Sequence, residues 1–200
     1  MNFIFVTRCY KQTNLQYVKK SIADVFYGTE HTYEHIIIVD MSYGTPYQIF
    51  KQYTDEHTTV FYAPTKYDND EWMSDWVDKI IQHVGSPQDY VFMLDDDNRL
   101  HPNFLGIVDE CDGSDVIVFK IEGRPNLGNK ELMYASSPVG YIDWANFITK
   151  VAVMREFHIY HGGKSGVCED SLFFLKMKTH GCSFKFVDSV FAFYNALPKP

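Results

Sequence analysis

Apolar residues occur in two alternating patterns over the first part of the chain. Some stretches are continuously apolar and short, which is typical of strands covered on both faces. Others repeat an apolar residue every three or four positions, which is typical of helices. The predicted strands are 3–6, 36–39, 60–63, 90–94 and 116–121. Helices are predicted over 15–26 and 72–84, and a short one follows Pro102. This alternation predicts an α/β fold with an open, mostly parallel sheet flanked by helices.

The second half of the chain loses this regular alternation. Its glycines and prolines predict a loop-rich connection over 122–140 and a further loop over 158–167. The remaining elements are predicted as a strand over 147–154, a helix over 172–178, and short strands over 184–187 and 190–194. No repeat, linker or low-complexity segment interrupts the chain, so we expect a single domain over 1–200.

The charge balance changes the range of partners to consider. The 200 residues include 18 basic and 26 acidic side chains, a formal charge of −8, which argues against a nucleic-acid-binding protein. The four cysteines lack metal-site or C-x-x-C spacing, and no apolar run approaches the length of a transmembrane segment. We therefore expect a cytoplasmic protein with reduced thiols.

Three adjacent carboxylates, Asp95, Asp96 and Asp97, follow the predicted strand 90–94. Such charges repel one another, and a divalent cation such as Mg²⁺ or Mn²⁺ would compensate them. Continued strand alternation would place Asp95 and Asp97 on the same side. Asp40 also ends a predicted strand, so it should share the carboxyl edge of the sheet with the triplet. The alternative is a solvated acidic turn that caps the next helix.

The run 90–97, followed by Pro102, resembles the D-x-D motif of GT-A glycosyltransferases, especially those of the family-two type. The segment 6–10 resembles the first-strand segment that receives the nucleobase in that family, with Thr7-Arg8 where isoleucine-proline is usual. The segment 36–42 resembles the second strand, whose terminal aspartate contacts the nucleoside.

A fourth landmark lies late in the chain. Glu169-Asp170 is similar to the E-D motif at the start of a late helix in the same family. The four landmarks keep their order, and the resemblance covers roughly 3–195. It implies a GT-A nucleotide-diphospho-sugar transferase fold. It also implies a metal-dependent transfer from a nucleotide-diphosphate sugar, with UDP favoured, to a hydroxyl on a glycan, lipid-linked or protein-linked acceptor. A lipid-linked acceptor would bring the protein to a membrane surface.

The resemblance also implies roles for individual residues. Asp97 would bind Mn²⁺ or Mg²⁺ directly, and Asp95 would contact the metal through water or contact the ribose. Asp170 would be the general base of an inverting reaction, and Glu169 would orient the acceptor or be the base itself. The expected donor-binding residues are Thr7, Arg8, Tyr10, Asp40, Asp95 and Asp96. Trp144 and Asn146 are weaker candidates for the acceptor side, and ordinary packing is the alternative for Trp144.

Three other classes of protein share some of these features. A sugar nucleotidylyltransferase would need a glycine-rich phosphate loop near the N-terminus, but 6–14 contains no glycine. A haloacid-dehalogenase-type phosphohydrolase carries its D-x-D on the first strand, whereas here the triplet follows the fourth predicted strand. A non-catalytic nucleotide-sugar binding module stays open, because it would need the same fold and donor contacts.

Overall fold

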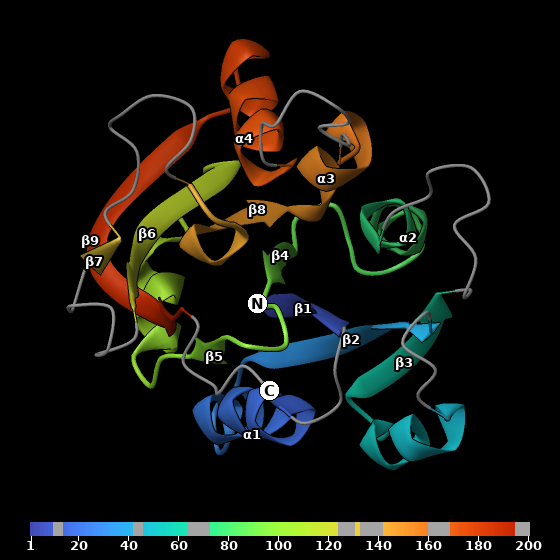
Figure 1. Ribbon diagram of the computed structural model, residues 1–200. Coiled ribbons are helices and arrows are strands. Elements are labelled where there is room, and N and C mark those ends of the chain that lie inside the picture. Colours follow the sequence, from blue (N-terminus) through green and yellow to red (C-terminus); the bar gives the residue numbers. More distant parts are fainter. Residues whose placement is uncertain are drawn as a thin grey trace.

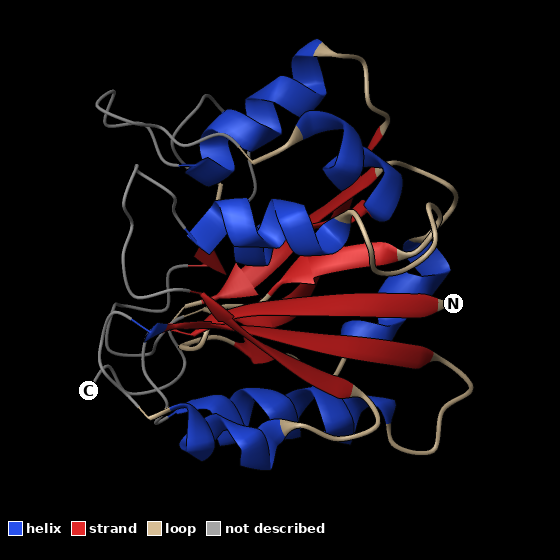
Figure 2. Ribbon diagram, turned by 90° about the vertical axis from the view of Figure 1, so that its right-hand side faces the viewer, coloured by secondary structure: helices blue, strands red, loops and turns tan. Residues whose placement is uncertain are grey.

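The computed structural model describes residues 1–9, 14–41, 46–63, 73–123, 131–132, 142–159 and 169–194. They form a nine-stranded sheet with helices against both faces (Figures 1 and 2). The strands are β1 (Asn2–Cys9), β2 (Thr32–Asp40), β3 (Thr58–Ala63), β4 (Tyr90–Met93), β5 (Arg99–Leu100), β6 (Val116–Glu122), β7 (Glu131–Leu132), β8 (Phe147–Lys150) and β9 (Phe184–Phe193). The α-helices are α1 (Leu15–Phe26), α2 (Met73–Ile81), α3 (Val151–Phe157) and α4 (Glu169–Thr179). Three 3₁₀ helices are η3 (Tyr47–Tyr53), η4 (Phe104–Glu110) and η6 (Trp144–Asn146). None of the helices within these ranges has the length and apolarity needed to span a membrane.

The sheet is open and mostly parallel, as the sequence predicts. Its strand order is β3-β2-β1-β4-β8-β6-β9-β5, and β7 pairs with β6. The longer pairings, β1–β2, β2–β3, β1–β4 and β6–β9, are parallel, whereas each antiparallel pairing joins only two or three residue pairs. The carboxyl ends of β2, β1 and β4 therefore lie side by side at one edge, where substrates bind in open α/β sheets.

Two apolar layers hold the helices against the sheet. Alternate residues of β1 point to opposite faces, so Phe3 and Phe5 join one core cluster while Ile4 and Val6 join the other. The first cluster includes buried residues of α1 and η4, and the second includes buried residues of α2, α3 and α4 (Figure 2). Both faces of the central strands are covered, which explains why their sequences are continuously apolar.

The prediction of a strand over 147–154 is correct only for its first half. The chain leaves the strand after Lys150 and continues as α3. The backbone N–H of Val151 donates to the Asp89 carbonyl at 2.8 Å, and Ala152 donates to Pro87 at 3.2 Å. These bonds hold the first turn of α3 against the loop that precedes β4. A short apolar segment of this kind is compatible with a strand or a helix, and here tertiary contacts select the helix.

Other boundaries differ in smaller ways. The two predicted strands 184–187 and 190–194 are one strand, β9, whose pairing with β6 contains register shifts between Val118 and Ile121. Neither η3 nor β5 was predicted. The short helix expected after Pro102 is confirmed as the 3₁₀ helix η4.

Gly28 and Gly85, which follow α1 and α2, both have positive φ angles, of 73° and 74°. A Cβ added to Gly28 would meet no heavy atom within 4 Å, whereas one added to Gly85 would lie 2.2 Å from Cδ1 of the buried Ile4. We expect Gly28→Ala to lower the free energy of unfolding by about 1–2 kcal/mol through backbone strain alone. Gly85→Ala should cost a further 1–3 kcal/mol, roughly, because Ile4 must repack. Urea unfolding of both variants checks this, and equal losses would contradict the packing argument.

Candidate active site

The acidic triplet lies in a turn at the carboxyl edge of the sheet. β4 ends at Met93, and Leu94 keeps one ladder bond by donating its N–H to the Val6 carbonyl at 2.9 Å. The N–H of Asn98 then donates to the Asp95 carbonyl at 3.0 Å, which closes a four-residue turn. Asp96 and Asp97 occupy its two central positions and are partly exposed. The expectation that strand alternation places Asp95 and Asp97 on one side is therefore wrong, because the strand ends before them.

Arg8, at the carboxyl end of β1, forms a two-point ion pair with Asp95. Its Nε donates to Oδ1 at 2.8 Å and its Nη2 donates to Oδ2 at 2.7 Å. The two side chains are 12% and 23% exposed, so the pair is largely shielded from solvent. Such fork-to-carboxylate geometry is the strongest form of ion pair in proteins. Both oxygens of Asp95 are thus engaged by the residue that stands where the resembled family has proline.

Next to this ion pair along the chain, a buried series of hydrogen bonds links β2, β1 and the end of β4. The Thr7 hydroxyl donates to the Leu94 carbonyl at 2.8 Å, so it accepts the bond from Nε2 of His35, also at 2.8 Å. Thr7 is fully buried and His35 is 1% exposed. The Thr7 hydroxyl thus holds the backbone of Leu94, the residue before Asp95, and donor binding by Thr7 stays a prediction.

Asp143, which the sequence analysis did not single out, belongs to the same acidic region. Its carboxylate accepts a hydrogen bond from the Ala145 N–H at 2.9 Å and caps η6. Burial is the main cause that raises the pKa of Asp143 to about 7, while the Ala145 bond opposes the rise. The charges of Asp95 and Asp170 add to it, and Arg8 offsets part of it. These contributions indicate that Asp95 and Asp170 lie in the neighbourhood of Asp143.

A sequence signal for Asp143 exists in retrospect. Asp143 and Asn146 stand three residues apart and form a reciprocal capping box, in which the Asp143 N–H donates to Oδ1 of Asn146 at 3.1 Å. This pattern indicates that the Asp143 side chain is held by the backbone. The pattern does not predict that Asp143 lies near Asp95 and Asp170, because Asp95 follows β4 and Asp170 belongs to α4.

The late E-D pair is at the predicted place, the start of α4. Asp170 is partly exposed, and its Oδ1 accepts a hydrogen bond from the Ser171 N–H at 2.7 Å. Glu169 is the first residue of α4, but its side chain lies outside the description. Asp40 ends β2 and is 5% exposed, and Tyr10 lies outside the described residues.

The two weaker acceptor candidates are part of the core. Trp144 is 4% exposed, and its ring lies 5.2 Å from that of Phe173 and 5.4 Å from that of Phe147. Asn146 is 1% exposed, and its Nδ2 donates to the Phe119 carbonyl at 3.2 Å. As placed, both side chains hold η6 against the sheet instead of facing an open acceptor surface.

Carboxylates are the usual protein ligands of Mg²⁺ and Mn²⁺. Among the described residues, no group of three or more histidine, cysteine, aspartate or glutamate side chains is arranged to hold a metal ion. Mg²⁺ and Mn²⁺ commonly need only one or two protein carboxylates in addition to substrate phosphates. With both oxygens of Asp95 held by Arg8, the partly exposed Asp96 and Asp97 are the members of the triplet that could contact a metal directly.

The sheet and its flanking helices have the GT-A fold. The solved structure of S. aureus TarS, 1–349, superposes with a TM-score of 0.70 at 17% identity, covering 96% of this chain and 60% of that one. The same protein in complex with UDP-GlcNAc superposes with a TM-score of 0.69 at 17% identity, covering 97% and 58%. Its UDP complex gives 0.68 at 17% identity, covering 97% and 60%. By sequence, the chain matches no family model and none of the curated proteins.

The buried His35 makes the stability of this site dependent on pH. Burial lowers the pKa of His35 to about 3, and its Nδ1 has no hydrogen-bond partner in the part of the chain that the structure describes. Below pH 6.5 the unfolded chain binds a proton here that the folded chain does not. The free energy of unfolding should therefore fall by about 2 kcal/mol between pH 7 and pH 5 from His35 alone.

Urea unfolding of the wild type and of His35→Gln at both pH values measures this contribution. Between pH 7 and pH 5 the free energy of unfolding of the wild type should fall by about 2 kcal/mol relative to that of His35→Gln, because the raised pKa of Asp143 adds a pH dependence of opposite sign that both proteins share. His83→Gln, which changes an exposed histidine at the end of α2, is the matched control and should behave as the wild type. An unchanged pH dependence in His35→Gln would contradict the assignment.

Proposed function

We propose that this protein transfers a sugar from a UDP-sugar to an acceptor hydroxyl. The observation that carries the proposal is the acidic site made by Asp95, Asp143 and Asp170 at the carboxyl edge of a GT-A sheet. Arg8 lies in the same site and provides a cation beside the carboxylates. The UDP-GlcNAc and UDP complexes of TarS support a uridine nucleotide as the donor. The acceptor would be a glycan, a lipid-linked saccharide or a protein-linked one.

Charge at the site supports a metal-dependent reaction. Asp95 and Asp170 are acidic neighbours of Asp143, whose own pKa is about 7, and the arginine of this region is already paired with Asp95. A diphosphate would be repelled by the excess negative charge unless a cation accompanies it. A bound Mn²⁺ or Mg²⁺ would stabilise the charge that develops on the departing diphosphate. Asp97 would hold that ion, while Asp95, fixed by Arg8, keeps the turn in place.

Asp170 is the residue proposed to act on the acceptor. Its position at the start of α4 favours the ionised carboxylate, because the helix dipole stabilises negative charge there. The acceptor oxygen would attack the anomeric carbon while its proton passes to Asp170. The bond from that carbon to the phosphate oxygen breaks with its electron pair, and UDP leaves. Attack opposite to the leaving group inverts the configuration.

Asp97→Asn should abolish the metal dependence of UDP binding. Isothermal titration of UDP with and without MnCl₂ measures it, and we expect the variant to lose about tenfold or more in affinity in the presence of metal. Asp109→Asn removes one charge from an exposed position on η4 and serves as the control. Asp97→Asn that still binds UDP more tightly with MnCl₂ than without it, by the same factor as the wild type, would contradict the role of Asp97. Failure of the wild type to bind UDP at all would contradict the choice of donor.

Asp170→Asn should leave UDP binding intact and remove turnover. Release of UDP from UDP-GlcNAc and other UDP-sugars, with Mn²⁺ present, gives kcat, and loss of the base should lower it by at least about 100-fold. Asp143→Asn is the matched control, because it neutralises another carboxylate of the same site and preserves the oxygen that caps η6. Its kcat should fall much less. Equal losses in both variants, or retained turnover by Asp170→Asn, would refute the assignment of Asp170 as base.

A further inference from the structure

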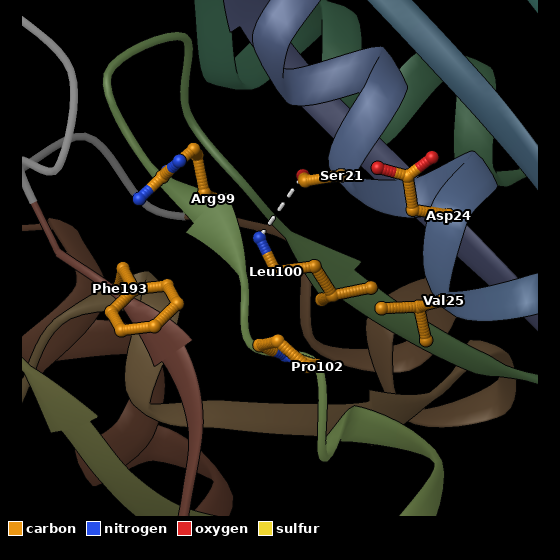
Figure 3. A pocket seen from close by; sticks show the side chains of 7 residues that line it. All are labelled: Ser21, Asp24, Val25, Arg99, Leu100, Pro102 and Phe193. Atoms are coloured by element: carbon orange, nitrogen blue, oxygen red, sulfur yellow. Dashed lines mark hydrogen bonds between the residues drawn. The ribbon is translucent and has the colours of Figure 1, made fainter.

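A second pocket lies between α1, β5 and the end of β9. Its volume is about 380 Å³, within the range of small-molecule sites. Figure 3 shows Ser21 and Asp24 of α1 on one side, Arg99 and Phe193 on the other, and Leu100 between them. The Leu100 N–H donates to the Ser21 hydroxyl at 3.2 Å, which ties β5 to α1 along the pocket. None of these residues has a role in the proposed transfer reaction.

Arg99 is the unusual member of this lining. Its Nε is buried and has no hydrogen-bond partner within the described ranges. Its guanidinium lies 5.4 Å from the centre of the Phe193 ring, a cation–π contact that supplies no hydrogen-bond acceptor. A buried donor without an acceptor is costly, and such groups in native proteins usually indicate a missing water, ion or ligand.

The charges around the pocket favour an anion as the missing partner. Asp24 is the acidic residue of the lining, and both of its oxygens accept hydrogen bonds from Lys20 at 2.8 Å. This pair, one turn apart on α1, is close to neutral as a unit. Arg99 is then the uncompensated charge of the pocket, and it is positive.

We propose that this pocket binds a small molecule through a phosphate or carboxylate group held by Arg99. The planar guanidinium of an arginine can donate from its terminal nitrogens to two oxygens of such a group. The Phe193 ring packs against the guanidinium, and the apolar surfaces of Val25 and Pro102 contact the remainder of the ligand. The proposed donor site has an arginine of its own, Arg8, which is paired with Asp95.

Side-chain NMR of the arginines tests the proposal directly, because the chain contains only four arginines. In a ¹H–¹⁵N spectrum, the Nε–H signal of Arg99 is assigned from its disappearance in Arg99→Lys. Titration with inorganic phosphate at constant ionic strength should shift this signal saturably. The Nε–H groups of Arg8 and Arg155, which are bonded to Asp95 and to the Ile81 carbonyl, should shift much less.

Variants and further ligands sharpen the result. Arg99→Gln should weaken phosphate binding at least tenfold, followed through the Leu100 amide signal, whereas Lys51→Gln, an exposed cation on η3, should not. Glucose 6-phosphate and glucuronate distinguish a phosphate from a carboxylate ligand, and neutral glucose should give no shift. A linear, non-saturating shift of Arg99, or equal weakening by Lys51→Gln, would overturn the proposal. UDP should move the Arg8 signal, so failure of the donor proposal would be seen separately.

Discussion

The ion pair between Arg8 and Asp95 is the interaction on which the edge of the sheet depends. A largely shielded pair of charges is stable only when its geometry is good, and here two parallel hydrogen bonds meet that requirement. It is the last of three successive links between β1 and β4, after the Val6–Leu94 ladder bond and the Thr7–Leu94 side-chain bond. Together they fix the point at which β4 ends and the acidic turn begins.

Much of the fold could be predicted because the central strands are covered on both faces. Continuous apolar runs such as 36–39 arise from that burial, and the helices between them keep their three- and four-residue spacing. The failure at 147–154 has a different physical origin. The local sequence at Val151 and Ala152 is compatible with a strand or a helix. Backbone hydrogen bonds to the loop before β4 stabilise the helix. Contacts of that kind are not encoded in the segment itself.

Part of the candidate site could be predicted, because its residues lie at the ends of strands or at the start of a helix. Asp40 and Asp95 come after strands, and Asp170 begins a helix, so their positions on the chain already place them at the carboxyl edge. Asp143 could not be placed this way. It precedes β8, an antiparallel strand inserted between β4 and β6, and only that pairing brings it to the other carboxylates. Arg8 was expected near the donor, but its pairing with Asp95 depends on strand order.

The turn at Asp95–Asn98 also explains how one short segment serves two different environments. Before the turn, Asp95 faces Arg8 at the acidic edge, and after it the chain pairs with β9 as β5 and packs against α1. Arg99 lies over the Phe193 ring. In the proposed reaction the acidic edge would bind its anionic donor with an added cation, whereas the pocket beside α1 already contains a cation, Arg99. Two anions could thus bind on either side of one turn, one together with an added cation and the other through Arg99.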